Sequence, residues 1–372
     1  MLIGVPKEIK DHEYRVGLSP ASAKELIAAG HQILIETNAG RAIGFDNQQY
    51  LEAGADIIAT PEEIFARAEM IVKVKEPQAH ECLQLRPKQV LYTFLHLAPD
   101  PKQTALLIAS GATCIAYETV TDQHGGLPLL APMSEVAGRM SIQAAAHHLE
   151  KTQGGSGLLL GGVPGVAPAK VLILGGGVVG SNAAKIAIGM GADVTVLDLS
   201  LARLRELDDI FGSQLRTIYS TKDAIDSYSA AADVIIGSVL IPGAAAPKLI
   251  RKAHLARMKP GSVIVDVAID QGGCFETSKP TTHQQPTYVV DNIVHYCVTN
   301  MPGGVARTAT LALNNATLPF ALNIANKGAE QAMRDDKHLL NGLNIYNGIV
   351  TCRAVAESLN HSYTEALTAI NS

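Results

Sequence analysis

The sequence contains no tryptophan, and aromatic residues of all kinds make up only 4% of its 372 residues. Aromatic side chains on which nucleic-acid bases stack are therefore scarce. The formal net charge of −5 also lacks the basic excess that binding to a phosphate backbone requires. These two shortages argue against a nucleic-acid-binding protein.

Cysteine is scarce too, because its five residues are odd in number and form no C-x-x-C pair. A disulfide framework or a structural zinc site is therefore not expected, and a reducing cytoplasm fits this usage. The most apolar stretch, residues 158–179, is interrupted by glycines, prolines and Lys170, whereas a membrane-spanning helix needs about 20 predominantly apolar residues. Lys7 and Glu8 precede any apolar segment, so we expect no signal peptide and a cytoplasmic location.

Charged residues are few, at 17%, while hydrophobic residues make up 47%. Charged residues usually account for about 25% of a globular domain. This composition excludes disorder and allows a large core, and the length favours two or three domains.

The first part of the chain alternates short apolar runs with helical patterns. Strands are expected at residues 2–5, 33–35, 71–74, 90–94 and 113–116, and helices at 20–29 and 61–68. Each of these helices begins with proline, which suits a first helical turn. The alternation predicts a parallel α/β layer. A long helix is expected to follow over residues 134–152.

The second α/β pattern predicts strands at residues 171–174, 194–197, 216–219, 233–236, 262–266 and 288–290, with helices that include 201–211 and 247–258. Six strands with crossover helices predict a Rossmann-type, doubly wound parallel sheet. Residues 310–333 and 358–370 are expected to be helical, and this tail is expected to have no sheet of its own. We expect this tail to rejoin the first part. The predicted architecture is a discontinuous α/β substrate domain of residues 1–130 and 305–372, with a dinucleotide-binding domain of residues 131–304.

Glycines at one predicted strand-to-helix junction have the G-x-G-x-x-G spacing, namely Gly175, Gly177 and Gly180. This spacing alone is weak evidence, but here it follows an apolar strand and opens a helix. The first glycine permits a tight turn, the second lets the backbone approach a pyrophosphate, and the third allows close packing of helix and strand. Asp198 ends the next strand, where a carboxylate accepts ribose hydroxyls and repels a 2′-phosphate. NAD is therefore favoured over NADP, although Arg203 nearby weakens that inference. The alternative is a purely structural turn with Asp198 as a helix cap.

Four polar residues are candidates for substrate chemistry. Arg15 precedes a helix, Lys75 and His96 follow apolar strands, and Asp270 follows the fifth strand of the second pattern. Arginine binds carboxylates through two parallel N–H bonds, lysine adds a point charge, and histidine exchanges protons near neutral pH. Each residue also has a structural interpretation. Arg15 or Lys75 could be a surface ion-pair partner, His96 a core histidine, and Asp270 a turn cap.

Several motifs in order along the chain resemble the alanine dehydrogenase family, which is related to the α subunit of proton-translocating transhydrogenase. They lie at residues 3–10, 13–16, 74–77, 94–98, 133–139, 175–180, 267–273 and 300–303. The resemblance implies NAD-dependent, reversible oxidative deamination of L-alanine to pyruvate and ammonium. It also implies a homo-oligomer, a hexamer in this family, with no nucleic-acid or membrane partner.

The resemblance also implies roles for individual residues. Arg15 and Lys75 would hold the substrate carboxylate, and His96 and Asp270 would be the acid/base pair. The residues implied to contact NAD are Ser134, Gly175, Gly177, Val178, Val179, Gly180, Asp198, Arg203, Ser220, Val239, Leu240, Val267, Ala268, Ile269, Asp270, Lys279, Val298, Thr299, Asn300 and Met301. Arg203 and Lys279 depart from the residues expected in some relatives, although both keep the positive charge.

No metal-binding pattern is present in the sequence. Two other functions stay open at this point. One is a nucleotide-binding component like that of transhydrogenase, and the other is a dehydrogenase of another, larger amino acid.

Overall fold

The computed structural model describes residues 1–239 and 246–372. It divides into two compact units, of which the first comprises Met1–Met133 and Val305–Ser372 and the second comprises Ser134–Gly304. The described residues form one eight-stranded sheet and one seven-stranded sheet. Both sheets are mainly parallel, which confirms the predicted α/β class. Among the described helices, none combines the length and the apolar character that crossing a bilayer requires.

The first sheet has the order β15-β14-β6-β5-β4-β1-β2-β3. The strands β1 to β6 are parallel to one another, whereas β14 is antiparallel to both β6 and β15. Their bounds are β1 Leu2–Val5, β2 Gln32–Glu36, β3 Asp56–Ile58, β4 Met70–Val72, β5 Val90–Thr93, β6 Thr113–Ala116, β14 Leu343–Tyr346 and β15 Ile349–Val350.

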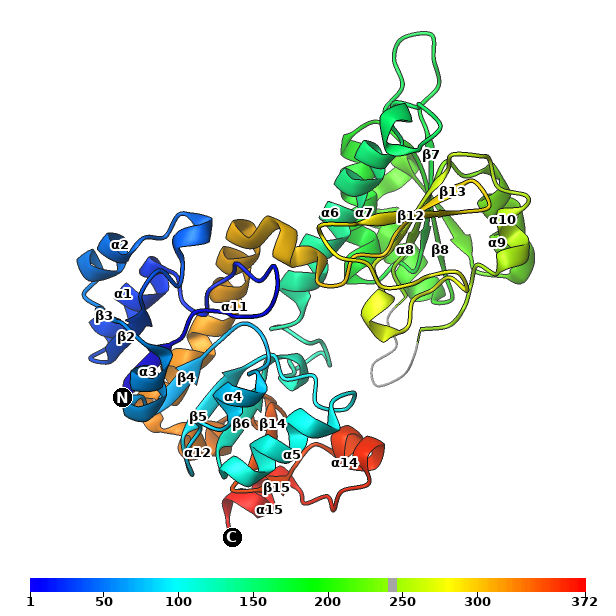
Figure 1. The fold of residues 1–372 in the computed structure, drawn as a ribbon. Coiled ribbons are helices and arrows are strands. Elements are labelled where there is room, and N and C mark those ends of the chain that lie inside the picture. Colours follow the sequence, from blue (N-terminus) through cyan, green and yellow to red (C-terminus); the bar gives the residue numbers. More distant parts are fainter. Residues whose placement is uncertain (240–245) are drawn as a thin grey trace. The chain divides into compact units, whose positions relative to one another are not determined.

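The two C-terminal strands are not predicted from the sequence, and they belong to the first sheet. They join through Asn347 and Gly348, which both have a positive φ, at 48° and 83°. An Asn-Gly pair with this geometry is typical of a tight hairpin turn. Figure 1 shows the C-terminal segment returning to place β14 beside β6.

Three helices of the first unit, α1, α3 and α5, begin at side-chain caps that are followed by proline. Ser19, Thr60 and Asp100 each accept a backbone N–H of the following first turn, and a proline begins each of those helices. The bounds are α1 Pro20–Ala28, α2 Asn47–Glu52, α3 Pro61–Arg67, α4 Ala79–Cys82, α5 Pro101–Ser110, α11 Ala306–Lys327, α12 Ala329–Asp335, α13 Lys337–Leu340, α14 Arg353–Leu359 and α15 Ala366–Ile370. The helix expected at 358–370 is wrong, because Asn360 adopts the left-handed conformation and ends α14.

The second sheet has the order β12-β13-β11-β10-β7-β8-β9. Its bounds are β7 Lys170–Leu174, β8 Asp193–Asp198, β9 Leu215–Tyr219, β10 Val234–Gly237, β11 Val263–Asp266, β12 Thr287–Val290 and β13 Ile293–Tyr296. Six strands are parallel in the predicted doubly wound order. The strand expected at residues 288–290 is instead the antiparallel edge strand β12, and β13 is the sixth parallel strand.

The helices of this half of the chain are α6 Ala131–His148, α7 Val178–Gly189, α8 Leu201–Phe211, α9 Lys222–Ala231 and α10 Lys252–Leu255. The long helix α6 thus begins before Ser134, where its start was predicted. The helix expected at 247–258 is reduced to α10. The preceding backbone pairs with a distant segment instead, since Ala246 N donates to Gln271 O and Leu249 N to Cys274 O.

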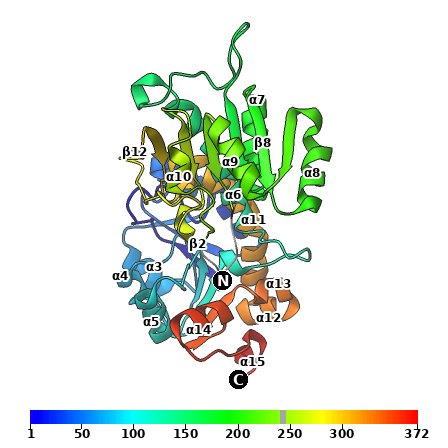
Figure 2. The same cartoon turned by 90° about the vertical axis from the view of Figure 1, so that its right-hand side faces the viewer.

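Core residues cover both faces of the second sheet. Along β7, Val171 and Ile173 belong to one buried cluster, whereas Leu172 and Leu174 belong to another. Successive side chains of a strand point to opposite faces, so both faces are covered, as a parallel sheet requires. Figure 2 shows α7 and α8 beside β8, against which both helices pack.

Candidate functional site

The two sheets each have a point where the strand order reverses. In the first sheet, β1 lies between β2 and β4, so the order reverses between β1 and β4. Ligands of open parallel sheets bind beyond the carboxyl ends of the strands at such a point. Arg15 lies in the connection that follows β1, and Lys75 lies three residues beyond β4.

Glu8 joins these two connections. Its carboxylate accepts the backbone N–H of Val74 at 2.7 Å and that of Lys75 at 3.2 Å. The loop that carries Arg15 is therefore held against the segment that carries Lys75. The structure brings both predicted substrate-binding residues to the same edge of the first sheet.

Arg15 is buried, with 2% of its surface exposed. Its Nε donates to Glu13 Oε1 at 2.7 Å and its Nη2 donates to Glu13 Oε2 at 2.6 Å. The Nη1 atom lies 3.1 Å from the sulfur of Met133. The bidentate geometry predicted for a substrate carboxylate is thus made to Glu13 in this state. Glu13 belongs to the motif at residues 13–16, and the sequence alone predicts no role for it.

A second buried ion pair lies beside Lys75. The Lys73 ammonium is 3.1 Å from Glu8 and 2.9 Å from Glu81, and its side chain is fully buried. Burial disfavours this charge, but the two carboxylates outweigh that effect and raise the pKa of Lys73. This buried group is not predicted from the sequence. The available signal was a lysine inside an apolar strand pattern, where a charge requires partners.

His96 follows β5 and has a positive φ of 49°. Non-glycine residues adopt this conformation at a cost, and such strain is concentrated at functional sites. Glu118 stabilises the conformation by accepting the His96 backbone N–H at 2.6 Å, and its carboxylate lies 3.9 Å from Nδ1. The ring stacks on Phe94 with 5.7 Å between centroids. The side chain is 45% exposed, so His96 is not the satisfied core histidine of the alternative interpretation.

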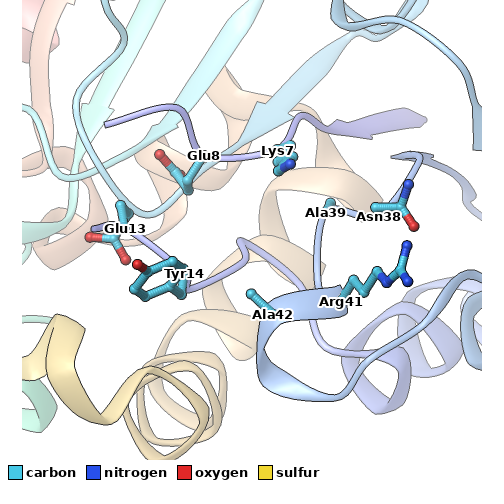
Figure 3. Close-up of a pocket in the computed structure, with 8 residues that line it drawn as sticks. All are labelled: Lys7, Glu8, Glu13, Tyr14, Asn38, Ala39, Arg41 and Ala42. Atoms are coloured by element: carbon cyan, nitrogen blue, oxygen red, sulfur yellow. The ribbon is translucent and has the colours of Figure 1, made fainter. Parts of the chain in front are cut away.

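A cavity of about 460 Å³ lies in the first unit beside the ion pairs of Arg15 and Lys73. Figure 3 shows Glu8, Glu13 and Tyr14 from the first loop and Asn38 and Arg41 from the segment after β2. The lining residues are Lys7, Glu8, Glu13, Tyr14, Asn38, Ala39, Arg41 and Ala42. Its walls therefore include Glu8 and Glu13, which hold Lys73 and Arg15.

The second sheet reverses its order between β7 and β10, and the glycine motif follows β7. Gly175 has a φ of 97°, and a Cβ at Gly180 would lie 1.8 Å from Gly175 O. A Cβ at Gly177 would meet no atom within 4 Å. Two glycines are thus required by the backbone itself, while Gly177 leaves open space at the start of α7. This space fits the approach of a pyrophosphate.

Helix α7 also leaves amide groups for such a ligand. Gly177 caps it without a side-chain hydrogen bond, and the Val178 and Val179 amides have no acceptor among the described residues. Unsatisfied first-turn amides are donors for a phosphate. The residues present therefore fit a dinucleotide.

Asp198 lies at the end of β8, directly beside this loop. Its carboxylate accepts the N–H of Gly176 at 2.6 Å and that of Ser200 at 2.8 Å. A carboxylate has about four acceptor positions, so capacity for ribose hydroxyls is left. Arg203 donates to Gly176 O at 2.6 Å, and Ser220 N donates to Asp198 O at 3.0 Å. Asp198 and Arg203 thus contact the glycine loop directly, and Ser220 is bonded to Asp198.

Val239, which follows β10, also lies beside the glycine loop. A Cβ placed on Gly175 would be 3.0 Å from its side chain. Leu240, the next predicted residue, lies outside the described residues. The predicted residues Val267, Ala268, Ile269 and Asp270 follow β11, and Val298, Thr299, Asn300 and Met301 follow β13. All these strands are parallel, so the groups share one edge of the second sheet.

No contact among the described residues places Ser134 or Lys279 at the glycine loop. Ser134 lies in α6, and Lys279 is exposed, with its backbone N–H donating to the Tyr288 hydroxyl at 2.6 Å. His96 belongs to the first unit and Asp270 to the second. Within the ranges that the structure describes, no group of three or more His, Cys, Asp or Glu side chains is arranged to hold a metal ion.

Comparison with known proteins gives one consistent family. The sequence profile of the alanine dehydrogenase/PNT N-terminal domain matches residues 4–137, and that of the C-terminal domain matches residues 141–353. A curated alanine dehydrogenase from Halomonas elongata is 58% identical over 100% of both chains. Another from Bacillus subtilis is 55% identical over 98% of this chain and 97% of the relative.

Solved structures agree with this result. An L-alanine dehydrogenase superposes with a TM-score of 0.94 at 50% identity, covering 97% of this chain and 99% of that one. A transhydrogenase from Sinorhizobium meliloti superposes with a TM-score of 0.82 at 24% identity, covering 95% of this chain and 100% of that one. The second likeness shows a shared fold alone.

Proposed function

The chain belongs to the alanine dehydrogenase/PNT family, and on that premise we propose that it catalyses the reversible, NAD-dependent oxidative deamination of L-alanine to pyruvate and ammonium. The observation that carries the proposal is the match over the whole chain to alanine dehydrogenases at more than half identity. The charged groups at the edge of the first sheet support it, since a small amino acid offers a carboxylate and an amine to be recognised.

Arg15 and Lys75 are the proposed carboxylate ligands. An arginine held by Glu13 is pre-organised, so less side-chain entropy is lost when it binds a substrate. Lys75 is only partly buried, and its side chain forms no ion pair with the described part of the chain. Its ammonium is therefore available for an anionic substrate.

His96 and Asp270 are the proposed proton-transfer residues. Deamination requires that the amine lose a proton and that water add to the carbon that carried it. Two opposite proton tasks suit one imidazole and one carboxylate. Exposure of both side chains supports access to substrate and water.

NAD is the proposed cofactor, and when bound it supplies the hydride acceptor for oxidation at Cα. The glycine loop, the amides of Val178 and Val179, and Asp198 are the groups proposed to hold it. The Asp198 carboxylate disfavours a 2′-phosphate at the adenosine ribose, which supports NAD over NADP. The remaining residues carried over from the family resemblance stay part of this proposal.

We also propose a cytoplasmic location and assembly into a homo-oligomer, a hexamer as the family resemblance implies. Five free cysteines support a reducing compartment. Leu159, Val163 and Val166, which precede β7, are 66%, 53% and 60% exposed. Such apolar exposure supports burial against another copy. Light scattering on the purified protein tests this, and a monomer would contradict it.

The test follows NADH absorbance with pyruvate and ammonium, then with a panel of larger 2-oxo acids. We expect rapid oxidation with pyruvate and slower oxidation with larger acids. His96→Ala should lower kcat by ~10²–10⁴-fold, whereas His361→Ala, at an exposed position, should leave it unchanged. A preference for a larger acid would favour another amino acid dehydrogenase. No oxidation of NADH with any acid would favour a nucleotide-binding component and would overturn the proposal.

A further inference from the structure

The turn that carries Asp270 has an unusual backbone. After the short helical turn Ile269–Gln271, Gly272 and Gly273 have successive positive φ angles of 87° and 79°. Only glycine adopts this conformation without strain, and glycine is also the residue with the greatest freedom to leave it. The Asp270 carboxylate forms no hydrogen bond or ion pair within the described ranges. The backbone of the turn therefore sets the position from which this side chain extends.

A buried carboxylate accepts hydrogen bonds from backbone N–H groups that follow this turn. Asp266 is fully buried, and it accepts the backbone N–H of Cys274 at 3.1 Å and that of Phe275 at 3.4 Å. The hydroxyl of Ser278 donates to the same carboxylate at 2.5 Å. A Cβ at Gly273 would lie 2.4 Å from Asp266 Oδ2, so glycine is required at that position.

An ammonium holds the carbonyl side of this turn. Lys248 Nζ donates to the carbonyl of Gly272, to that of Gly273 at 2.9 Å and to that of Phe275 at 3.3 Å. An ammonium has three donors, so these three carbonyls use all of them. Hydrogen bonds from a charged donor are about twice as strong as neutral ones. Lys248 thus cross-links three carbonyls of the turn through a single cation.

The backbone around Lys248 is itself anchored to the turn. Ala246 N donates to Gln271 O at 2.9 Å, and Leu249 N donates to Cys274 O at 2.8 Å. The lysine therefore reaches the carbonyls from a segment that already pairs with the turn. Removal of its ammonium would take a shared donor from three carbonyls, two of which belong to flexible glycines.

We propose that Lys248 is a positioning residue that keeps Asp270 in place for proton transfer by binding the carbonyls of Gly272, Gly273 and Phe275. This inference rests on the proposed function, in which Asp270 exchanges a proton during deamination. Lys248 touches neither reactant in this role and acts only through the turn.

The test is a double-mutant cycle on the full-length enzyme, with Lys248→Met, Asp270→Asn and both together. We expect Lys248→Met alone to lower kcat by up to about 10²-fold, the effect of a small misplacement of a reacting group. In the Asp270→Asn background the same change should lower kcat by less than about twofold, because residues acting as a unit are not additive. Lys248→Arg, which keeps a charged donor, should restore most of the turnover.

Matched controls separate positioning from folding. Lys252→Met removes another exposed lysine, whose side chain has no hydrogen bond or ion pair within the described ranges, and should leave kcat unchanged. The melting temperature of each variant is measured alongside, and Lys248→Gln replaces Lys248→Met if the latter does not fold.

Three outcomes would count against the idea. Full turnover in both Lys248→Met and Lys248→Gln would overturn the positioning role, as would equal losses with and without Asp270. Full turnover in Asp270→Asn would instead overturn the proposed role of Asp270 itself. The two failures are therefore distinguishable.

Discussion

Glu13 and Arg15 form a buried, bidentate ion pair, with Nε and Nη2 of the guanidinium 2.7 and 2.6 Å from the two carboxylate oxygens. The two residues are close in sequence, and both side chains are almost fully buried. We expect this contact to stabilise the loop after β1 and to orient Arg15 for binding the substrate carboxylate.

Glu13→Gln should destabilise the protein and weaken substrate binding together. Removal of one partner from a buried ion pair typically costs about 3–5 kcal/mol. We expect a lower urea midpoint and a raised KM for pyruvate, with the dissociation constant of NADH little changed. Glu62→Gln, at an exposed position of α3, is the control. An unaltered KM in a folded Glu13→Gln variant would contradict the orienting role.

Lys73→Met should destabilise the protein more at pH 8 than at pH 5. The substitution leaves Glu8 and Glu81 buried without their cation, at a cost of about 3–5 kcal/mol. Burial already raises the pKa of Glu8, so protonation at lower pH relieves part of that cost.

Urea denaturation of Lys73→Met at the two pH values measures this effect, with the exposed Lys102→Met as control. A loss of stability that does not depend on pH would show that packing of the side chain, and not its charge, dominates.

Asp198→Ala should weaken NAD binding and relax the discrimination against NADP. A charge-assisted hydrogen bond contributes about 1.5–3 kcal/mol, which corresponds to a rise in the NAD KM of roughly 10- to 10²-fold. The change also removes the acceptor of the Gly176 amide, so the loop loses a contact. Initial rates with both cofactors provide the measurement, and Asp209→Ala on α8 is the control. An unchanged cofactor ratio would argue against the ribose assignment.

His295 should make the protein less stable as the pH falls below about 6.5. The ring is fully buried, its Nδ1–H donates to Ile293 O at 2.9 Å, and its Nε2 accepts from the Thr277 hydroxyl at 2.7 Å. Burial lowers the pKa of His295, so the neutral form is favoured in the folded state. The stability from this difference is present above the unfolded pKa and is lost as the pH falls through it.

Melting temperatures between pH 7 and pH 5 measure the effect of His295. His295→Gln should be less stable at pH 7 but should lose less stability on acidification, whereas exposed His361→Gln should follow the parent protein. Parallel curves for His295→Gln and the parent would exclude His295 as the source.

Much of the second unit could be predicted from local pattern. The strand before Gly175, the glycine spacing and the acidic residue that ends the next strand all lie within one short segment. Local signals failed where backbone partners came from far away. A helix is predicted from residue 247 onward, but the backbone of Leu249 and Ile250 pairs with residues 274–276 instead.

The buried ion pairs of the first unit could not be predicted from the sequence. Lys73 lies in an apolar pattern. Its partner Glu8 is far away in the sequence, whereas its partner Glu81 is near. No periodicity links such residues, because ion pairing depends on distance in space. Glu13 was easier to predict, because it lies in the motif at residues 13–16, two residues before Arg15.

By itself, the sequence determined the α/β class, the glycine turn and the family, because these depend on short-range periodicity, on residues with special backbone freedom and on motifs in order. Only the tertiary structure decided that Glu13 holds Arg15, that Glu8 spans two loops and that Lys248 binds the turn after Asp270. The reason is physical, because a charge is stabilised by whichever partner the fold brings within hydrogen-bond distance. The residues that separate the two partners in the sequence do not indicate that contact.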